Sequence, residues 1–320
     1  MTTQHAHPTE EASTSHVSEA ASHGEFRRLL VAVDGRRGSS LTPVDVAAAI
    51  AREHDARPHA LSVVDPFVSG SIVTGLEGAV SQAPALRADQ WRRQADLRKQ
   101  VAERTGFYGG WSFDVPLGSP ADAIVSEARK IGADLIVMGL RRRGALDRMV
   151  HDETTLRVIR HAPAPVLAVT DRLRSMPRTV IVALDFTAAS SEAAKTACDL
   201  FRGCAKIVLV YVESDFDATI AEHDEGTRVI RREGIAGAFR RLRDELGVLP
   251  GTVVETAVLR GAIVSQLTSF VERTEADVLA VARQEHGLAE RVMIGSVTTA
   301  LVRYAPCSML VTPAGWRAAH

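Results

Sequence analysis

The chain is poor in cysteine and in aromatic residues. Among its 320 residues, Cys198, Cys204 and Cys307 are the only cysteines; they form no CxxC motif and have no histidine nearby at ligand spacing. We therefore expect neither a disulfide framework nor a zinc site, and the three thiols should be reduced and buried. The 9 Phe, 3 Trp and 3 Tyr are too few to build stacking platforms for single-stranded nucleic acid or sugars.

An excess of charge and long apolar runs are also missing. The 38 Lys and Arg balance 39 Asp and Glu, so no broad positive field attracts nucleic acid or a membrane surface. No apolar run approaches the ~20 residues of a membrane-spanning helix, and the N-terminus lacks the pattern of a secretion signal. A cytoplasmic location is expected. The GxSxG, HExxH, GxxxxGK[ST] and GxGxxG motifs are absent, so no catalytic residue and no metal ligand is assigned.

What is present favours a folded α/β protein. The 46% of hydrophobic and 24% of charged residues are typical of globular chains, and the length suits about two domains. Residues 1–25 hold few large aliphatic side chains and are predicted to form a disordered tail. From Phe26 onward, short aliphatic runs alternate with helical patterns, which predicts parallel sheets covered by helices. The first half should hold strands at 29–34, 60–65, 111–115, 134–139 and 165–170, helices at 42–54, 86–104, 122–130 and 154–160, and an inserted loop at 66–85.

The same order of elements then repeats. VIVALD (180–185) repeats LLVAVD (29–34), and DVLAVA (277–282) follows DLIVMG (134–139) by 143 residues. Gly261 follows Gly118 by the same offset. The chain therefore contains an internal duplication.

The duplication predicts two domains, at 26–170 and 179–315, joined by a linker at 171–178 and followed by a short tail at 316–320. The fifth strand of each domain should be an edge strand, and the two edges can cover one another across a pseudo-twofold axis. Pairing of whole chains into a homodimer is left open.

The stretches VAVDG, GADLIVMG and RHAPAPVLAV, together with the repetition, resemble the universal stress protein family in its tandem two-domain form. The resemblance covers residues 26 to about 315 and implies two five-stranded, parallel-sheet domains of the adenine nucleotide alpha hydrolase-like type. In nucleotide-binding members, a G-x2-G-x9-G-[ST] loop follows the fourth strand, and an Asp ending the first strand lies near the adenosine. Glycines in such a loop let backbone N–H groups approach phosphate oxygens.

The first repeat departs from this loop. Gly139 keeps the first glycine, Arg142 replaces the second, and Asp152 and Glu153 stand where Gly-Ser belongs. We expect Asp152 and Glu153 to open the next helix, cap its N–H groups and repel phosphate. The first repeat is therefore predicted not to bind ATP in the family manner.

The second repeat departs differently. Ala282 and Glu285 replace the first two glycines, whereas Gly295 and Ser296 keep the final pair. Glu285 adds bulk and negative charge, so affinity for a triphosphate should be poor without a bridging cation. The second repeat is the better candidate for ATP with Mg²⁺, although Gly-Ser is also an ordinary helix start.

Two further features admit two readings each. Asp34 and Asp185 end the first strands, where open parallel sheets place ligands. The resemblance implies an adenosine contact, but an Asp there also caps the loop into the next helix. Arg141, Arg142 and Arg143 could hold an anion through forked hydrogen bonds, or they are a solvated charge run.

Three functions follow as hypotheses. The first is a non-catalytic stress-response module that needs no cofactor and acts through protein partners that the sequence does not identify. The alternative is a nucleotide sensor or slow ATPase that uses Asp185, Gly295 and Ser296 with Mg²⁺. The third is an enzyme that takes another phosphorylated substrate through the three arginines.

Overall fold

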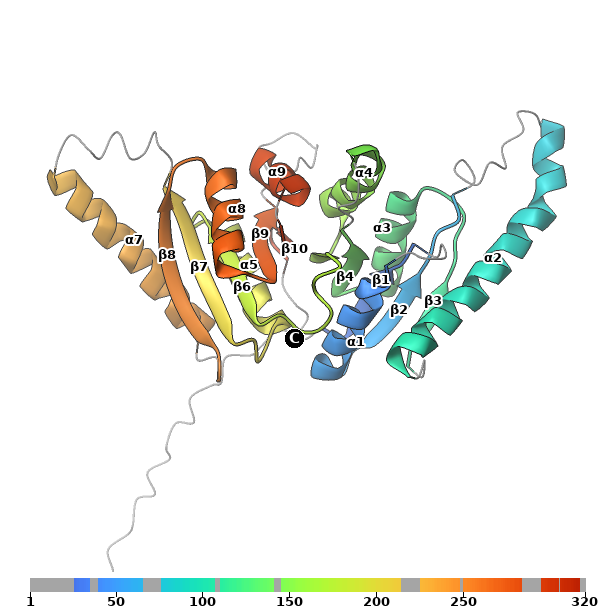
Figure 1. The fold of residues 1–320 in the computed structure, drawn as a ribbon, viewed down its shortest axis with the longest axis horizontal. Helices are drawn as coiled ribbons and strands as arrows, with labels where there is room; N and C mark the ends of the chain where they lie inside the picture. Colours follow the sequence, from blue (N-terminus) through green and yellow to red (C-terminus); the bar gives the residue numbers. More distant parts are fainter. Residues whose placement is uncertain are drawn as a thin grey trace, which may run out of the picture.

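The computed structural model describes residues 26–34, 40–65, 76–106, 110–140, 145–213, 225–247, 250–283, 295–304 and 306–316. These residues form one ten-stranded sheet with helices on both faces (Figure 1). The strand order is β3-β2-β1-β4-β5-β10-β9-β6-β7-β8, so each half of the chain supplies five neighbouring strands. The α/β fold class predicted from the sequence is confirmed, and the two predicted sheets join into one.

The first half supplies β1 (Arg28–Ala32), α1 (Thr42–His54), β2 (Arg57–Leu61), α2 (Leu76–Thr105), β3 (Ser112–Asp114), α3 (Pro120–Ile131), β4 (Leu135–Gly139), α4 (Ala145–His161) and β5 (Val166–Val169). The second half supplies β6 (Thr179–Leu184), α5 (Ala188–Leu200), β7 (Lys206–Glu213), α7 (Glu225–Leu246), β8 (Val253–Arg260), α8 (Ile263–Thr274), β9 (Val278–Arg283), α9 (Ser296–Tyr304) and β10 (Ser308–Pro313).

The core consists of two hydrophobic layers, one on each face of the sheet. Successive strand residues point to opposite faces, so Leu29 packs into one layer and Leu30 into the other. Residues of α1, α2, α5 and α7 cover the first face, and residues of α3, α4, α8 and α9 cover the second. Strands buried on both faces must be apolar throughout, which explains the continuous aliphatic runs of β4 and β9.

The two halves meet where β5 pairs antiparallel with β10. Leu167 lies opposite Leu310, and all other neighbouring strands pair parallel. At the end of this seam, the buried Thr170 donates its backbone N–H to Ser308 Oγ at 3.1 Å. The prediction that the fifth strands cover one another is confirmed, and the strand order is symmetric about the seam.

The turn that follows the third strand has the same geometry in both halves, between β3 and α3 and between β8 and α8. Gly118 and Gly261 have φ values of 137° and 120°, a region that disfavours any residue with a Cβ. Gly118 donates its N–H to the Val64 carbonyl at 3.0 Å, and Gly261 donates to the Glu213 carbonyl at 3.0 Å. The 143-residue offset seen in the sequence is therefore an equivalence of backbone conformation.

The predicted second strand, 60–65, is wrong in its position, since the observed strand begins and ends earlier in the chain. The strand runs over Arg57–Leu61, where Leu61 pairs with Ala32, and only an isolated bridge from Val64 to Leu117 follows it. Val64 is apolar because it is fully buried beyond the strand, and not because it belongs to the ladder.

The predicted loop at 66–85 is wrong in its second half. Helix α2 begins at Leu76 and contains Pro84, which is exposed. The predicted helix at 86–104 is therefore the C-terminal part of a longer one. Residues 66–75 of the predicted loop and residues 1–25 of the predicted tail lie outside the described residues.

Candidate functional site

The carboxyl ends of the first and fourth strands meet at the same edge in each domain. In the first domain, β1 pairs with β2 on one side and β4 on the other, which makes this the point where the strand order reverses. Asp34 follows β1 by two residues, and Gly139 ends β4. The fold thus brings these two predicted site residues to the edge where open parallel sheets bind ligands.

Gly139 is not required to be glycine by the described protein. Its φ is not positive, and the nearest atom to an added Cβ would be Pro43 Cγ at 3.8 Å, an ordinary contact. A Cβ at the first position of the loop would therefore contact α1 without a clash.

Helix α4 overturns one prediction about the first domain. It begins at Ala145, so Asp152 and Glu153 lie in its interior and do not open it. Glu153 is exposed, and the Asp152 side chain is outside the described part of the chain. By the 143-residue offset, the start of α9 at Ser296 corresponds to residue 153, so α4 begins eight residues earlier than its counterpart. Ala145 and Leu146 are strong helix formers, which explains the earlier start.

The longer α4 changes what the backbone can offer a phosphate. Only the first four N–H groups of a helix lack an internal partner, and the later ones bond to the carbonyl four residues back. The N–H groups of residues 149–153 lie beyond the first four positions of α4. They are therefore not available to cradle phosphate oxygens as the loop of a nucleotide-binding domain would.

The second domain keeps a short helix at the corresponding place. Gly295 precedes α9, and its carbonyl accepts the N–H of Thr299 at 3.0 Å. Thr298 Oγ1 donates to the Ala282 carbonyl at 3.3 Å, which holds the start of α9 against the end of β9. Ala282, Gly295 and the exposed Ser296 are thus brought together, while Glu285 lies outside the described residues.

Asp185 is directed toward its own loop. Its Oδ1 accepts hydrogen bonds from the Thr187 backbone N–H at 3.0 Å and from Thr187 Oγ1 at 2.6 Å. Thr187 in turn caps α5 by accepting the Ser190 N–H at 3.3 Å. Of the two readings of Asp185, the geometry shows the capping one. Asp34 is half-buried, and the residues that follow it, 35–39, are among those the structure does not describe.

Arg283 is a residue of this edge that the sequence reasoning missed. It directly follows Ala282, is only 6% exposed, and reaches across the seam. Its Nη1 lies within 2.8–3.1 Å of the carbonyl oxygens of Ile159, Arg160 and Ala162 at the C-terminal end of α4. A cation at a helix C-terminus satisfies unpaired carbonyls and matches the helix dipole. The end of β9 is therefore fixed to the first domain.

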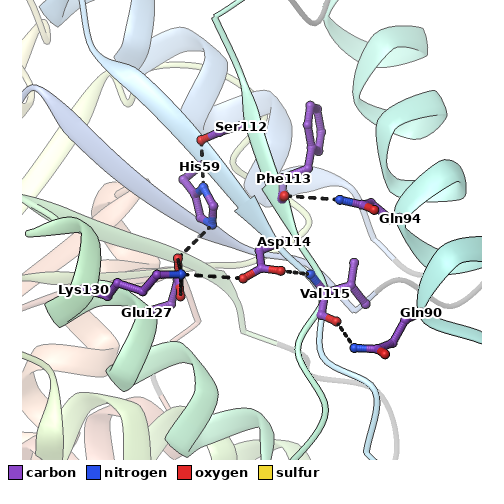
Figure 2. A network of polar contacts seen from close by, with 9 residues as sticks. All are labelled: His59, Gln90, Gln94, Ser112, Phe113, Asp114, Val115, Glu127 and Lys130. Atoms are coloured by element: carbon purple, nitrogen blue, oxygen red, sulfur yellow. Dashed lines mark hydrogen bonds and ion pairs between the residues drawn. The ribbon is translucent and has the colours of Figure 1, made fainter. Parts of the chain in front are cut away.

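A second cluster of titratable groups lies on the outer strands β2 and β3 of the first domain and on the neighbouring helix α3 (Figure 2). His59 Nδ1 lies 2.7 Å from Ser112 Oγ, and His59 Nε2 lies 3.4 Å from Glu127 Oε1. Lys130 Nζ contacts both Glu127 oxygens at 3.1 Å. Burial lowers the pKa of His59, although Glu127 and Asp114 act in the opposite direction. The hydrogen bond to Glu127 raises the pKa of Lys130.

The cysteines are free and buried, as predicted. Burial raises the pKa of Cys198 to about 12, so this thiol stays protonated and unreactive at neutral pH. Within the described ranges, no three His, Cys, Asp or Glu residues are grouped to hold a metal ion, and no helix is long and apolar enough to cross a membrane. The predicted anion contacts Arg141, Arg142 and Arg143 lie outside those ranges.

Comparison with known families finds one model twice. The model described as "Universal stress protein family" matches residues 25–170 and again residues 176–313. Universal stress protein MJ0531 of Methanocaldococcus jannaschii is 33% identical over 144 residues, which are 45% of this chain and 82% of that protein. Stress response protein NhaX of Bacillus subtilis is 26% identical over 164 residues, 44% of this chain and 96% of that protein.

Solved structures share the two-domain fold. Protein PA1789 of Pseudomonas aeruginosa has a TM-score of 0.61 at 16% identity and covers 90% of this chain and 92% of its own. A universal stress protein of Archaeoglobus fulgidus has a TM-score of 0.58 at 16% identity, with coverage of 91% and 99%. Both similarities extend over the two halves of the chain.

Proposed function

Since the chain belongs to the universal stress protein family, with the family's domain present twice, we propose that it acts as a non-catalytic stress-response module. In this proposal the chain works through contacts with protein partners, requires no cofactor, and does not use its first domain to bind ATP. One of its relatives is named a stress response protein.

The start of α4 at Ala145 is the observation that carries the proposal. A phosphate loop needs several free N–H groups in an open, glycine-rich turn. Helix α4 occupies this part of the first domain with backbone whose later N–H groups are bonded internally.

Two features support weakened binding in the second domain. Ala282 carries a Cβ where the family loop has glycine, and Arg283 fixes the end of β9 to α4 of the first domain. The end of β9, held in this way, has less freedom to shift toward a triphosphate. Glu285 would add negative charge to the phosphate path.

A thermal-shift screen tests the proposal on the full chain. ATP, ADP, AMP and GTP are added with and without Mg²⁺, and the midpoint of unfolding is measured. A ligand that binds only the folded state raises this midpoint. The proposal expects no concentration-dependent rise with any of the four, and a saturable rise with MgATP contradicts it.

A second candidate function is a nucleotide sensor or slow ATPase in the second domain. It is favoured by the contact of Thr298 with Ala282, which keeps Gly295 and Ser296 at the helix start next to the end of β9. Bound Mg²⁺ would offset the charge of Glu285. Gly295→Val then abolishes nucleotide binding, whereas Gly234→Val in the exposed part of α7 leaves it intact. Binding unchanged by Gly295→Val contradicts this candidate.

A homodimer, if it forms, must use a surface other than the seam. The edges of β5 and β10 already pair with one another within the chain. Size-exclusion chromatography with multi-angle light scattering measures the mass of the protein in solution and decides between monomer and dimer.

A further inference from the structure

A cavity of about 530 Å³ lies at the junction of the two domains, separate from the candidate nucleotide residues. One wall is the start of the linker, with Arg172 and Leu173, and the opposite wall is the end of α8 and the turn into β9. Neither Asp34 and Gly139 nor Asp185, Gly295 and Ser296 line it. Its volume is within the range of small-molecule sites.

The lining of the cavity has an apolar part beside two polar residues, Thr170 and Asp277, whose side chains already bond to Ser308 and to the backbone N–H groups of Arg178 and Thr179. Leu173, Val271 and Ala276 line the apolar part, and each is less than a tenth exposed. Cys307 and Pro306 add to the same lining. A ligand with an aliphatic body would lose water contacts there and gain packing.

The mouth of the cavity carries opposite charges that do not meet. Arg172 stands on the linker side, and Glu272 and Glu275 stand at the end of α8. All three are exposed, and their side chains make no hydrogen bond or ion pair with another described residue. By contrast, the buried Glu213 contacts both Arg231 and Arg260. Around this cavity, a cation and two anions remain open to a ligand.

We propose that this cavity binds a small zwitterion with an aliphatic body, such as a free amino acid or a dipeptide with apolar side chains. The ligand's ammonium group faces Glu272 and Glu275, and its carboxylate accepts the forked hydrogen bonds of Arg172. Its aliphatic part lies on Leu173, Val271 and Ala276. The linker is one wall, so binding would hold the linker against the second domain.

The probes are L-leucine and L-leucyl-L-leucine, which share an aliphatic body and differ in the distance between their charges. Each is titrated into the full chain while the methyl resonances of Leu173, Val271 and Ala276 are followed by NMR. Two analogues with a single charge, 3-methylbutylamine and 4-methylpentanoate, are titrated in parallel. The proposal expects saturable shifts with at least one zwitterion, and binding weaker by about tenfold or more with each analogue.

Variants of the charged residues at the cavity mouth should fold normally, because Arg172 and Glu275 are exposed. Arg172→Gln and Glu275→Gln are each expected to weaken zwitterion binding by about tenfold. Arg172→Gln should also bring the affinity for the zwitterion close to that for 3-methylbutylamine. The matched controls are Arg232→Gln and Glu233→Gln, at two neighbouring exposed residues of α7. They should leave binding unchanged.

Three results overturn the proposal. The first is the absence of saturable methyl shifts with both zwitterions at millimolar concentrations. The second is binding that Arg172→Gln and Glu275→Gln leave unchanged, and the third is equal affinity for a zwitterion and both of its analogues. None of these results bears on nucleotide binding, so the proposed function is tested separately.

Discussion

Asp277 in the second domain makes the same contact as Asp134 in the first. Asp134 Oδ2 accepts the backbone N–H groups of Arg27 and Arg28 at 2.9 and 2.8 Å. Asp277 Oδ2 accepts those of Arg178 and Thr179 at 2.7 and 3.0 Å. Each carboxylate ties the start of the fourth strand of its domain to the start of the first, its neighbour in the sheet.

Replacing either aspartate removes two hydrogen bonds to backbone N–H groups. Asp134→Ala and Asp277→Ala should each lower the free energy of unfolding by about 2–3 kcal/mol, because the N–H groups lose a charged acceptor. Urea unfolding followed by circular dichroism measures the change. Asp122→Ala is the control, since Asp122 pairs with Arg157 on the surface, and it should cost less than about 1 kcal/mol. Equal losses for all three variants contradict this account of the two aspartates.

Arg283→Met removes the donor that joins β9 to the end of α4. The carbonyl oxygens of Ile159, Arg160 and Ala162 then lose their bonds to Nη1, and the last turn of α4 should open more often. Hydrogen exchange at the Ala162 amide is expected to quicken by about tenfold or more. Arg240→Met, on the exposed side of α7, should leave that amide unchanged. Exchange that is the same in both variants shows that Arg283 does not secure α4.

Burial of His54 and partial burial of His59 predict a loss of stability in mild acid. Burial lowers the pKa of His54 and of His59 below the ordinary value of 6.5. The unfolded chain therefore binds protons more tightly than the folded chain in this range. The contribution of the two neutral histidines to the free energy of unfolding is complete above pH 6.5. It is lost as the pH drops from 6.5 toward the lower pKa values that these histidines have in the folded chain. Unfolding midpoints at about pH 7.5 and about pH 5.5 measure the slope; an equal or higher midpoint in acid contradicts the prediction.

The network around His59 sets its pKa in opposing directions (Figure 2). Burial has the largest effect and lowers the pKa of His59. Glu127 raises this pKa and Lys130 lowers it. Glu127→Gln should therefore lower the pKa of His59 further, and Lys130→Met should raise it. NMR titration of the imidazole carbon resonance measures both. If both variants shift the pKa of His59 in the same direction, the opposing effects assigned to Glu127 and Lys130 are wrong.

Gly139 and Gly132 should respond differently to a methyl group. Gly139→Ala should change the free energy of unfolding by less than about 0.5 kcal/mol, because its φ is not positive and, among the described residues, only Pro43 Cγ lies within 4 Å of the new Cβ. Gly132→Ala should cost about 1 kcal/mol or more, since Gly132 has φ 59° and the Arg28 guanidinium lies 3.1 Å from the new Cβ. Thermal unfolding compares the two, and a larger loss for Gly139→Ala contradicts the prediction.

The central strands could be predicted from the sequence because burial on both faces leaves a continuous apolar run. This holds for β4 and β9, whose residues are almost all buried. The edge strand β8 gives no such signal, since Val253 and Val258 are exposed and the strand alternates between half-buried and exposed residues. The second strand was misplaced because Pro58 and His59 interrupt its apolar pattern, while the buried Val64 extends the pattern past the strand.

Parts of the site depend on distances that a sequence does not contain. The positions of Gly295 and Ser296 at a helix start follow from local chemistry and were predicted. The start of α4 at Ala145 was not, because Asp152 and Glu153 are good capping residues that here fall inside a longer helix. Arg283 was not recognised either, since its partners are carbonyl groups 121–124 residues away in the other domain.

The central claim is that helix α4 occupies the phosphate-loop region of the first domain, and that the second domain has lost two of the three loop glycines, at Ala282 and Glu285. Calorimetric titration of MgATP into the full chain tests this directly. The account predicts no saturable heat up to millimolar nucleotide. A one-site or two-site isotherm with a micromolar Kd contradicts it.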